Sequence, residues 1–276
     1  MQADIQSLKI SFIGGGNMAR ALISGILQKG FSPTHINVIE SDPVKRQALV
    51  ADFSVLSTDQ LPSITKSDVV ILAIKPQHLR DVAIFLGSLL SQQLVISIAA
   101  GVRVQDLTTW LGGYRTIVRV MPNTPAQIQK GVSALFAADA VNPTQRESAE
   151  TLMQAVGQTL WLDQEEKMDA VTAISGSGPA YVFYFIEALE SAAAKLGFTP
   201  DQARMLAVET FSGAVQLAAM GKASPSELRV QVTSKGGTTE QALLSMQSAG
   251  VEEAIIKAAE AAAMRSKELG DMLGKH

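Results

Sequence analysis

Two glycine-rich stretches, far apart in the chain, have the residue types and spacing to bind negatively charged groups. The first, GGGNMA at residues 14–19, matches Gly-x-Gly-x-x-Ala between an apolar run and a helical pattern. There Gly14 allows a tight turn, Gly16 lets the backbone approach a diphosphate, and the small Ala19 permits close packing of helix on strand. The helix N-terminus adds amide donors, so the stretch predicts a dinucleotide site, with a purely structural turn as the alternative.

The second stretch is VTSKGGTTEQAL at residues 232–243. Two glycines expose backbone amides just before a helix whose capping box is expected to begin at Thr238, and such a helix start can bind a carboxylate. Gly237 and Thr238 would then donate from the backbone, while the hydroxyl of Ser234 or Thr239 reaches a neighbouring polar atom. The alternative is that the threonines only cap their helix and the glycines only turn the chain.

An acid is expected about 20 residues after a dinucleotide-binding glycine loop, where it bonds the ribose hydroxyls of NAD. Glu40 stands there, at the end of the apolar run in INVIESDP. Its carboxylate should repel the additional phosphate of NADP, yet Ser41, Lys45 and Arg46 follow and offer donors for that phosphate. The choice between NADH and NADPH therefore stays open, and a solvated turn is the alternative role for Glu40.

Three further loops follow apolar runs: AIKPQ at 73–77, SIAAG at 97–101 and MPNTP at 121–125. Ligands of an open α/β sheet collect at the carboxyl ends of its strands, so these loops are candidates to line a cofactor cleft. Each can equally be an ordinary connection between a strand and a helix.

Short β-rich runs alternate with helical patterns in the first part of the chain, which is typical of βαβ units and a mostly parallel sheet. We expect an α/β domain over residues 1–163, with helices on both faces of the sheet. The expected strands are residues 8–13, 36–40, 69–74, 94–98 and 117–120, with 132–137 and 159–162 as candidates to extend the sheet.

After residue 163 alanine-rich segments replace the strand pattern, so we expect an all-helical domain over residues 164–276. A helix should open at Gly178, and capping boxes at Thr199, Ser224 and Thr238 predict three more helix starts. The helix that opens at Gly178 has the sequence PAYVFYFIEALESAAAKLG. It is apolar around much of its circumference and must be buried. We expect a second subunit to cover part of it, with packing inside its own domain as the alternative.

The composition argues against several classes of site and partner. The 23 basic and 26 acidic residues give a net charge of -3, which offers no footprint for nucleic acid or an anionic membrane. Without cysteine, and with three scattered histidines, the chain has little material for a metal site or a His-based triad. The opening residues lack the apolar region of a secretory signal, and we expect a cytoplasmic protein without a membrane segment.

Six blocks resemble pyrroline-5-carboxylate reductase in order and spacing: FIGGGNMARALISGI, AIKPQ, VISIAAGV, RVMPNTPA, AVTAISGSGPAYVFYFIEAL and VTSKGGTTEQAL. The resemblance implies reduction of 1-pyrroline-5-carboxylate to L-proline with NADPH or NADH, the last step of proline synthesis. It also implies an N-terminal Rossmann domain, a helical C-terminal dimerisation domain, and a homodimer or a decamer of dimers with the substrate site near the dimer interface.

The motifs and the resemblance together assign residues to the cofactor and to the substrate. The cofactor set is Gly14, Gly15, Gly16, Asn17, Met18, Ala19, Glu40, Ser41, Ala73, Ile74, Lys75, Pro76 and Asn123. By resemblance, Gly236, Gly237 and Thr238 would bind the substrate carboxylate, Ser234 would assist, and the Thr239 hydroxyl would reach the ring nitrogen. One position departs from the family pattern, since Lys235 stands where the family usually has proline, which would stiffen the loop.

Two other functions fit the glycine loop. A 3-hydroxy acid dehydrogenase would need a lysine four residues after Gly178 and an asparagine one turn later, but Val182 and Ile186 stand there. A non-catalytic dinucleotide sensor would share the first loop and would have no need of Gly237, Thr238 and Thr239. Hydride transfer to an imine fits better, because it needs little acid-base help from the protein.

Overall fold

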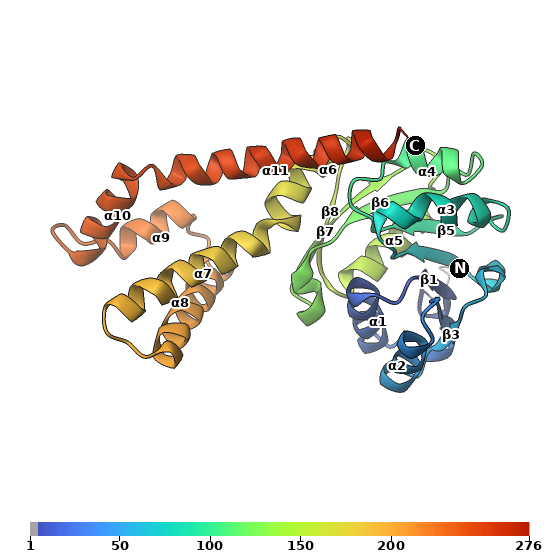
Figure 1. Cartoon of the computed structure of the whole chain (residues 1–276), viewed down its shortest axis with the longest axis horizontal. Helices are drawn as coiled ribbons and strands as arrows, with labels where there is room; N and C mark the ends of the chain where they lie inside the picture. Colours follow the sequence, from blue (N-terminus) through green and yellow to red (C-terminus); the bar gives the residue numbers. More distant parts are fainter. Residues whose placement is uncertain (1–4, 276) are drawn as a thin grey trace. The chain divides into compact units, whose positions relative to one another are not determined.

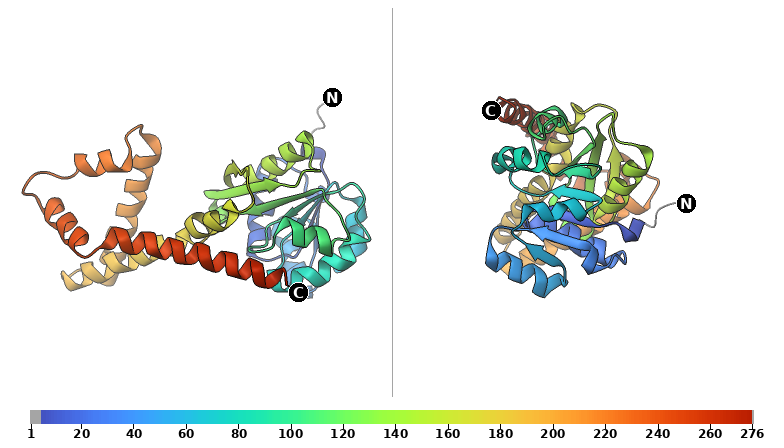
Figure 2. Two further views of the ribbon diagram at one scale, coloured as in Figure 1. Left: turned by 90° about the horizontal axis from the view of Figure 1, so that it is seen from above. Right: turned by 90° about the vertical axis from the view of Figure 1, so that its right-hand side faces the viewer.

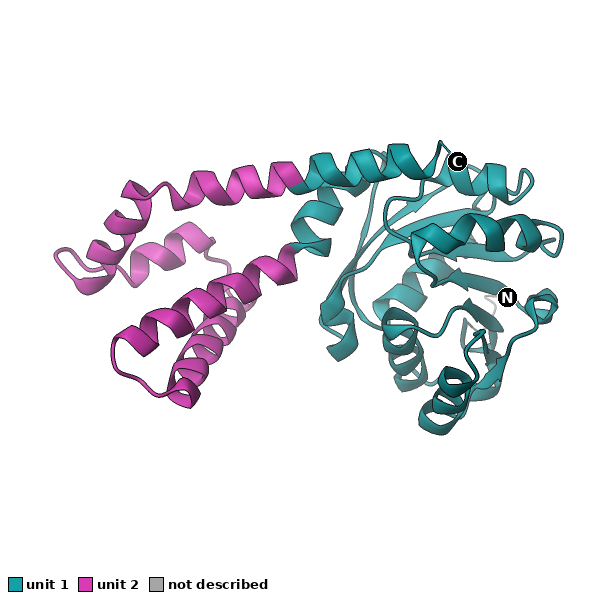
Figure 3. Cartoon of the chain, in the orientation of Figure 1, with its two compact units in different colours: residues 1–177, 262–276 teal, residues 178–261 magenta. Residues whose placement is uncertain are grey.

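The computed structural model describes residues 5–275, which fold as two compact units (Figure 3). Unit 1 contains the chain up to residue 177 together with the part from 262 onward, and unit 2 contains residues 178–261. His276 and the first four residues lie outside the described residues. Those first four residues belong to the opening segment in which no secretory signal is expected. The domain boundary after residue 163 stays a prediction; unit 1 also takes in residues 164–177.

Unit 1 is built on one eight-stranded sheet in the order β3-β2-β1-β4-β5-β6-β7-β8 (Figure 1). All neighbouring strands run parallel except β6 and β7, which are antiparallel. The strands are β1 (Ile10–Ile13), β2 (Ile36–Ile39), β3 (Leu56–Thr58), β4 (Val69–Leu72), β5 (Leu94–Ser97), β6 (Ile117–Met121), β7 (Gly131–Ala137) and β8 (Gly157–Trp161). The predicted mostly parallel sheet is confirmed, and β3 is an additional edge strand that the sequence pattern did not indicate.

Helices lie on both faces of this sheet (Figure 2). They are α1 (Asn17–Gln28), α2 (Pro43–Phe53), α3 (Pro76–Gly87), α4 (Val104–Trp110), α5 (Pro143–Gln154) and α6 (Lys167–Val171). Shorter turns of helix are η1 (Ile5–Ser7), η2 (Pro33–His35), η3 (Leu61–Lys66), η4 (Thr124–Ile128) and the π-helical η5 (Thr172–Gly176). The C-terminal segment contains α7 (Gly178–Lys195), α8 (Pro200–Met220), α9 (Pro225–Gln231), α10 (Thr238–Ser248) and α11 (Val251–Leu273).

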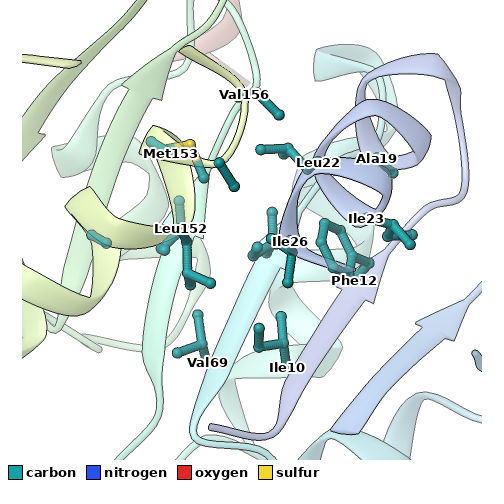
Figure 4. Packing of buried hydrophobic residues seen from close by; sticks show 14 of the residues in the cluster. Ile10, Phe12, Ala19, Leu22, Ile23, Ile26, Val69, Leu152, Met153 and Val156 are labelled. Carbon is teal, nitrogen blue, oxygen red and sulfur yellow. The ribbon is translucent and has the colours of Figure 1, made fainter. Parts of the chain in front are cut away.

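Alternation along the strands divides the apolar side chains between two cores. Ile10 and Phe12 of β1 pack toward α1 and α5 (Figure 4). Ile13 belongs to the core beneath α3 and α4. Because successive side chains on a strand point to opposite faces, a strand buried on both sides must be apolar at nearly every position. This requirement explains the continuous apolar run VVIL in β4, which is buried throughout.

The end of α11 belongs to unit 1 although the helix begins in unit 2. Arg103 Nη2 lies 2.6 Å from Asp271 Oδ1, and Ser266 Oγ donates to Asp169 Oδ1 at 2.7 Å. Leu273 packs against the core beneath α3 and α4. The last residues of the chain therefore contribute to the unit that holds its first strand.

The helices of unit 2 leave large apolar side chains exposed on the single chain. Phe183 and Tyr184 of α7 are 61% and 72% exposed, and Met220 at the end of α8 is 86% exposed. The only described residues buried on α8 are the small Ala203 and Ala207. Exposed apolar surface of this kind marks an interaction face, in agreement with the expected second subunit.

Candidate active site

The carboxyl ends of β1 and β4 form the point at which the strand order reverses, because β2 lies on one side of β1 and β4 on the other. Backbone hydrogen bonds join the first residue after β1 to the end of β2, and the first residue after β4 to the end of β1. Gly14 N donates to Ile39 O at 2.8 Å, and Ala73 N donates to Ile13 O at 2.8 Å. Open α/β sheets bind ligands at such a switch point, so this edge is where a cofactor is expected.

The glycine loop after β1 has the shape that a diphosphate requires. Gly14 has a φ of +98°, and a Cβ added there would lie 2.7 Å from Ala73 O. Gly16 caps α1, and a Cβ added to it would meet nothing within 4 Å, so this backbone is open to an incoming group. Ala19, 1% exposed, packs in the core, and the amides at the start of α1 face no side-chain cap. The loop therefore fits a dinucleotide by its own geometry.

Glu40 follows β2 and bonds directly to the glycine loop. Its Oε2 accepts from Gly15 N at 3.0 Å, and its Oε1 accepts from Asp42 N at 3.0 Å. Burial alone would raise the pKa of Glu40, but these amides, the charge of Lys45 and the Ser41 hydroxyl hold it below its ordinary value. Glu40 is thus an ionised acceptor beside the loop, as the ribose of a dinucleotide requires.

A pocket of about 330 Å³ opens beside the glycine loop. It brings together Gly14, Glu40, Ser41 and Ile74 from the predicted cofactor set. The full lining is Ile13, Gly14, Ile39, Glu40, Ser41, Asp59, Leu61, Ile74, Asp81, Val82 and Phe85. Four predicted residues from three segments therefore share one cavity, whose lining combines apolar side chains with several polar groups.

The loop after β4 lies against the glycine loop. A Cβ on Gly14 would meet both Ala73 O and Ile74 Cγ2 at 2.7 Å, which shows how closely the two loops approach. Lys75 caps α3, and Pro76 occupies the first position of that helix. Ile98 N donates to Leu72 O at 3.2 Å and thereby links the loop after β5 to the same edge. Two of the three predicted strand-end loops thus begin side by side at this edge of the sheet.

Asn123, in the loop after β6, is bonded on both ends of its amide. Its Nδ2 donates to Ser175 O at 3.2 Å and to Ser175 Oγ at 3.1 Å, while its Oδ1 accepts from Val132 N at 2.9 Å. The side chain therefore ties β7 and the π-helical turn η5 to the end of β6. A contact between Asn123 and the cofactor stays a prediction, and the structure shows the side chain in this connecting role.

The second glycine-rich stretch lies in unit 2, before α10. Gly236 has a φ of +74°, and a Cβ on Gly237 would lie 2.5 Å from Ser234 Oγ, so each glycine is required for a different reason. Gly237 N donates to Ser234 O at 3.0 Å, and Gly236 N donates to Glu240 Oε2 at 2.7 Å. Both glycine amides are thus used inside the loop. The roles predicted for these residues toward a substrate stay predictions.

The expected capping box at Thr238 is wrong. The helix N-cap is Gly237, which has no side chain to accept, and Thr238 is the first residue inside α10. The carboxylate of Glu240 reaches back to Gly236 instead. The boxes at Thr199 and Ser224 are present, because each of those side chains accepts from the third residue of its helix. Lys235 is exposed in this loop.

Two acidic residues of the pocket, Asp59 and Asp81, were missed by the sequence analysis. Asp59 directly follows β3, a three-residue edge strand of sequence LST that has no apolar run to reveal it. The signal that was available is topological, since a sheet that continues past its second strand places the next strand end at the same edge. Asp81 lies on α3, and a single acidic residue in a helical pattern does not indicate a pocket.

Across residues 5–275, no helix is long and apolar enough to span a bilayer. Within those same residues, no group of three or more His, Cys, Asp or Glu side chains is placed to hold a metal ion.

Comparison with protein families matches two parts of the chain. Residues 165–269 match the pyrroline-5-carboxylate reductase dimerisation family, and residues 9–101 match the family of coenzyme F420-dependent NADP oxidoreductases. The match of residues 165–269 to a dimerisation family agrees with the apolar side chains that these helices expose. The chain therefore carries an oligomerisation domain.

Individual relatives are similar over nearly the whole chain. A pyrroline-5-carboxylate reductase from Pseudomonas aeruginosa is 42% identical over 269 residues, covering 97% of this chain and 98% of the relative. The solved structure of one from Coxiella burnetii has a TM-score of 0.90 at 41% identity, covering 95% of this chain and 98% of that one. A Plasmodium falciparum pyrroline carboxylate reductase with NADP bound has a TM-score of 0.86 at 28% identity, covering 96% and 99%. The chain belongs to the pyrroline-5-carboxylate reductase family.

Proposed function

We propose that this protein reduces 1-pyrroline-5-carboxylate to L-proline with NADH or NADPH, as the last step of proline synthesis. The single observation that carries the proposal is the similarity over 97% of the chain to a relative of that name. When bound, the reduced nicotinamide supplies the hydride that adds to the carbon of the ring imine. The ring nitrogen, protonated as iminium, becomes the secondary amine of proline.

The cofactor would lie along the glycine loop of unit 1. The start of α1 and residues 14–19 would bind the diphosphate, Glu40 would accept from ribose hydroxyls, and residues 73–76 would border the nicotinamide half. The supporting geometry is the open backbone at Gly16, the ionised carboxylate of Glu40 and the close contact between Gly14 and Ala73. The protein's contribution is to bind the cofactor and to hold it in one orientation.

The substrate carboxylate would bind at the start of α10. The first amides of a helix have no partner inside the helix, so Thr238 is the donor that the proposal uses. Gly236 and Gly237 shape the turn and donate within the loop, and Ser234 lies beside Gly237. The Thr239 hydroxyl would reach the ring nitrogen, which leaves the substrate with polar contacts at both its charged groups.

The active form would be a homodimer, or a decamer built from dimers, in the cytoplasm. Support for a second subunit comes from the exposed Phe183 and Tyr184 of α7 and from the dimerisation family matched by residues 165–269. A chain without cysteine needs no oxidising compartment for its stability. Light scattering of the purified protein would distinguish a dimer from a decamer and from a monomer.

The function is tested by mixing the purified protein with NADH or NADPH and 1-pyrroline-5-carboxylate. We expect the absorbance of the reduced cofactor to fall and L-proline to appear in equal amount. Tight cofactor binding without oxidation would favour a dinucleotide sensor, and turnover of a 3-hydroxy acid in place of the imine would favour the dehydrogenase alternative.

Thr239→Ala tests the assignment of the substrate loop. Removing the hydroxyl should lower kcat by about tenfold, the range of one lost hydrogen bond to a charged group, while cofactor affinity is unchanged. Gly16→Ala should instead weaken cofactor binding, because its methyl group would enter the space that the diphosphate needs. An unchanged kcat in Thr239→Ala would contradict the role given to its hydroxyl.

A further inference from the structure

The pocket beside the glycine loop is acidic where a dinucleotide would place its adenosine ribose. Glu40, Asp59 and Asp81 all line it. Among residues 5–275 the lining includes no lysine or arginine. A phosphate on the 2′-oxygen of that ribose would therefore enter a pocket that presents carboxylates and lacks cationic side chains.

Two cationic side chains stand near this pocket without lining it: Lys45, which is exposed and whose charge lowers the pKa of Glu40, and Arg46. The guanidinium of Arg46 is already engaged. Its Nη1 donates to Glu40 O at 2.7 Å and to Ser41 O at 2.9 Å. Its Nη2 lies 3.6 Å from Asp59 Oδ2. To reach a 2′-phosphate, Arg46 would have to give up the two carbonyl oxygens that it holds in the turn after β2.

The carboxylates of Glu40 and Asp59 are both ionised under ordinary conditions. The hydrogen bonds described above hold the pKa of Glu40 below its usual value against the effect of burial. A hydrogen bond from the Gln60 side chain and the charge of Arg46 lower the pKa of Asp59. Both carboxyl groups therefore carry a negative charge near neutral pH, and a phosphate would meet two anions there.

We propose that Asp59 is a second specificity-determining residue and that Glu40 and Asp59 together make this chain prefer NADH to NADPH. The proposal rests on the proposed function, in which the dinucleotide lies along the glycine loop. Glu40 accepts from the ribose hydroxyls of NADH, and a 2′-phosphate removes one of these donors. The phosphate also adds negative charge beside two carboxylates, and like charges a few ångströms apart repel each other.

This preference is a property of residues in this chain and is separate from the reaction. The Plasmodium falciparum relative has NADP bound, so the family as such does not exclude the phosphorylated cofactor. What differs between cofactors is a single group, the 2′-phosphate. A ligand pair that differs only in that group isolates the effect from catalysis.

The test is calorimetric titration of the full-length protein with ADP-ribose and with 2′-phospho-ADP-ribose, neither of which can transfer hydride. We expect ADP-ribose to bind at least about tenfold more tightly, the effect of one close like-charge contact at a partly solvated site. The ratio should shrink at high salt, because exposed charges are screened. Equal affinities, or tighter binding of the phosphorylated ligand, would overturn the proposal.

Asp59→Asn should raise the affinity for 2′-phospho-ADP-ribose by about three- to tenfold and leave that for ADP-ribose unchanged. Glu147→Gln, at an exposed position on α5, makes the same change in net charge and should alter neither value. If the ratio of the affinities for the two ligands is the same in wild type and Asp59→Asn, then Asp59 does not discriminate between them.

Arg46→Gln distinguishes the two roles open to the guanidinium. If Arg46 only holds the turn, its loss should weaken both ligands to a similar degree. A loss of tenfold or more confined to the phosphorylated ligand would show that Arg46 binds the phosphate, and would overturn the proposal.

Failure of this inference can be told apart from failure of the proposed function. Faster turnover of pyrroline-5-carboxylate with NADPH than with NADH would contradict the preference and leave the reaction intact. Tighter binding of ADP-ribose without any turnover would support the preference and contradict the reaction.

Discussion

The glycine loops at residues 14–19 and 234–239 are both helix N-termini, yet they are held in different ways. A glutamate oxygen accepts from a glycine amide in each: Glu40 from Gly15 at 3.0 Å, and Glu240 from Gly236 at 2.7 Å. Glu40 directly follows another strand, 25 residues along the chain from Gly15, whereas Glu240 belongs to the helix that its own loop begins. The first loop is shaped by tertiary contacts and the second by local ones.

This difference predicts what each loop needs in order to form. The first is packed against β4 and its following loop, so its shape depends on the assembled sheet. The second keeps its turn through neighbours a few residues away and is mostly exposed. A local turn of this kind can be present before its binding partners are, whereas the first loop forms only with the fold.

Gly14→Ala should have the largest effect, because it breaks the tertiary loop. The added Cβ would lie 2.7 Å from Ala73 O, on a residue whose φ is +98°. Strain and overpacking together should lower the free energy of unfolding by about 2–4 kcal/mol and abolish cofactor binding. Urea denaturation and ADP-ribose titration measure the two effects.

Gly16→Ala is the matched control for that variant. Its Cβ would meet no atom within 4 Å, so stability should be kept while cofactor affinity falls. A Gly14→Ala protein that is as stable as Gly16→Ala would contradict the close packing described for the first loop.

Gly237→Ala should have an intermediate effect that stays within the substrate loop. Its Cβ would lie 2.5 Å from Ser234 Oγ and 3.0 Å from Ser234 O, but Gly237 has an ordinary φ of -83°, so the strain is one of crowding and not of backbone conformation. We expect kcat/KM for pyrroline-5-carboxylate to fall by about tenfold, with ADP-ribose affinity unchanged. Removal of the hydroxyl in Ser234→Ala/Gly237→Ala should relieve the shorter of the two contacts without restoring full activity. Loss of cofactor affinity in Gly237→Ala would argue against the independence of the two loops.

Glu240→Gln should have a smaller effect, in the opposite direction. Glutamine keeps an oxygen for the Gly236 amide and removes a negative charge from the helix start at which the substrate carboxylate would bind. We expect KM for pyrroline-5-carboxylate to fall by about two- to fivefold, the range of a single charge near a helix terminus. Steady-state kinetics measure it, and an increased KM would show that the charge itself is needed.

The smallest effect expected is the pH dependence contributed by Glu40. Because its folded pKa lies below the ordinary 4.5, the carboxylate stabilises the fold above that pH and loses this contribution as pH falls through the folded pKa. The difference in unfolding free energy between wild type and Glu40→Gln should be constant near neutrality and shrink below pH 4.5. Its size should be below about 1 kcal/mol, since Glu40 is partly exposed. A difference that grows in acid would reverse the sign.

Local patterns in the sequence predict most of the sheet and the first loop, because the expected strands are short runs rich in apolar and β-branched residues and the expected loops follow them. The same patterns miss β3, which is three residues long and has only one apolar side chain. They also misplace the cap of α10, since Thr238 has a capping residue's chemistry but lies inside the helix. Asp59 reaches the pocket through the pairing of β3 with β2, and the bonds of Arg46 to Glu40 O and Ser41 O depend on the geometry of one turn. Periodicity within one segment shows neither.

The ending of α11 has a consequence for how the chain is made. Ser266 is translated 97 residues after its partner Asp169, and Asp271 is translated 168 residues after its partner Arg103. These contacts can therefore form only after the helices of unit 2 have been synthesised. A fragment that ends after η5 would contain every strand of the sheet and still lack the part of α11 that lies against Gly101 and Arg103, so the contacts of unit 1 are not complete in an N-terminal piece.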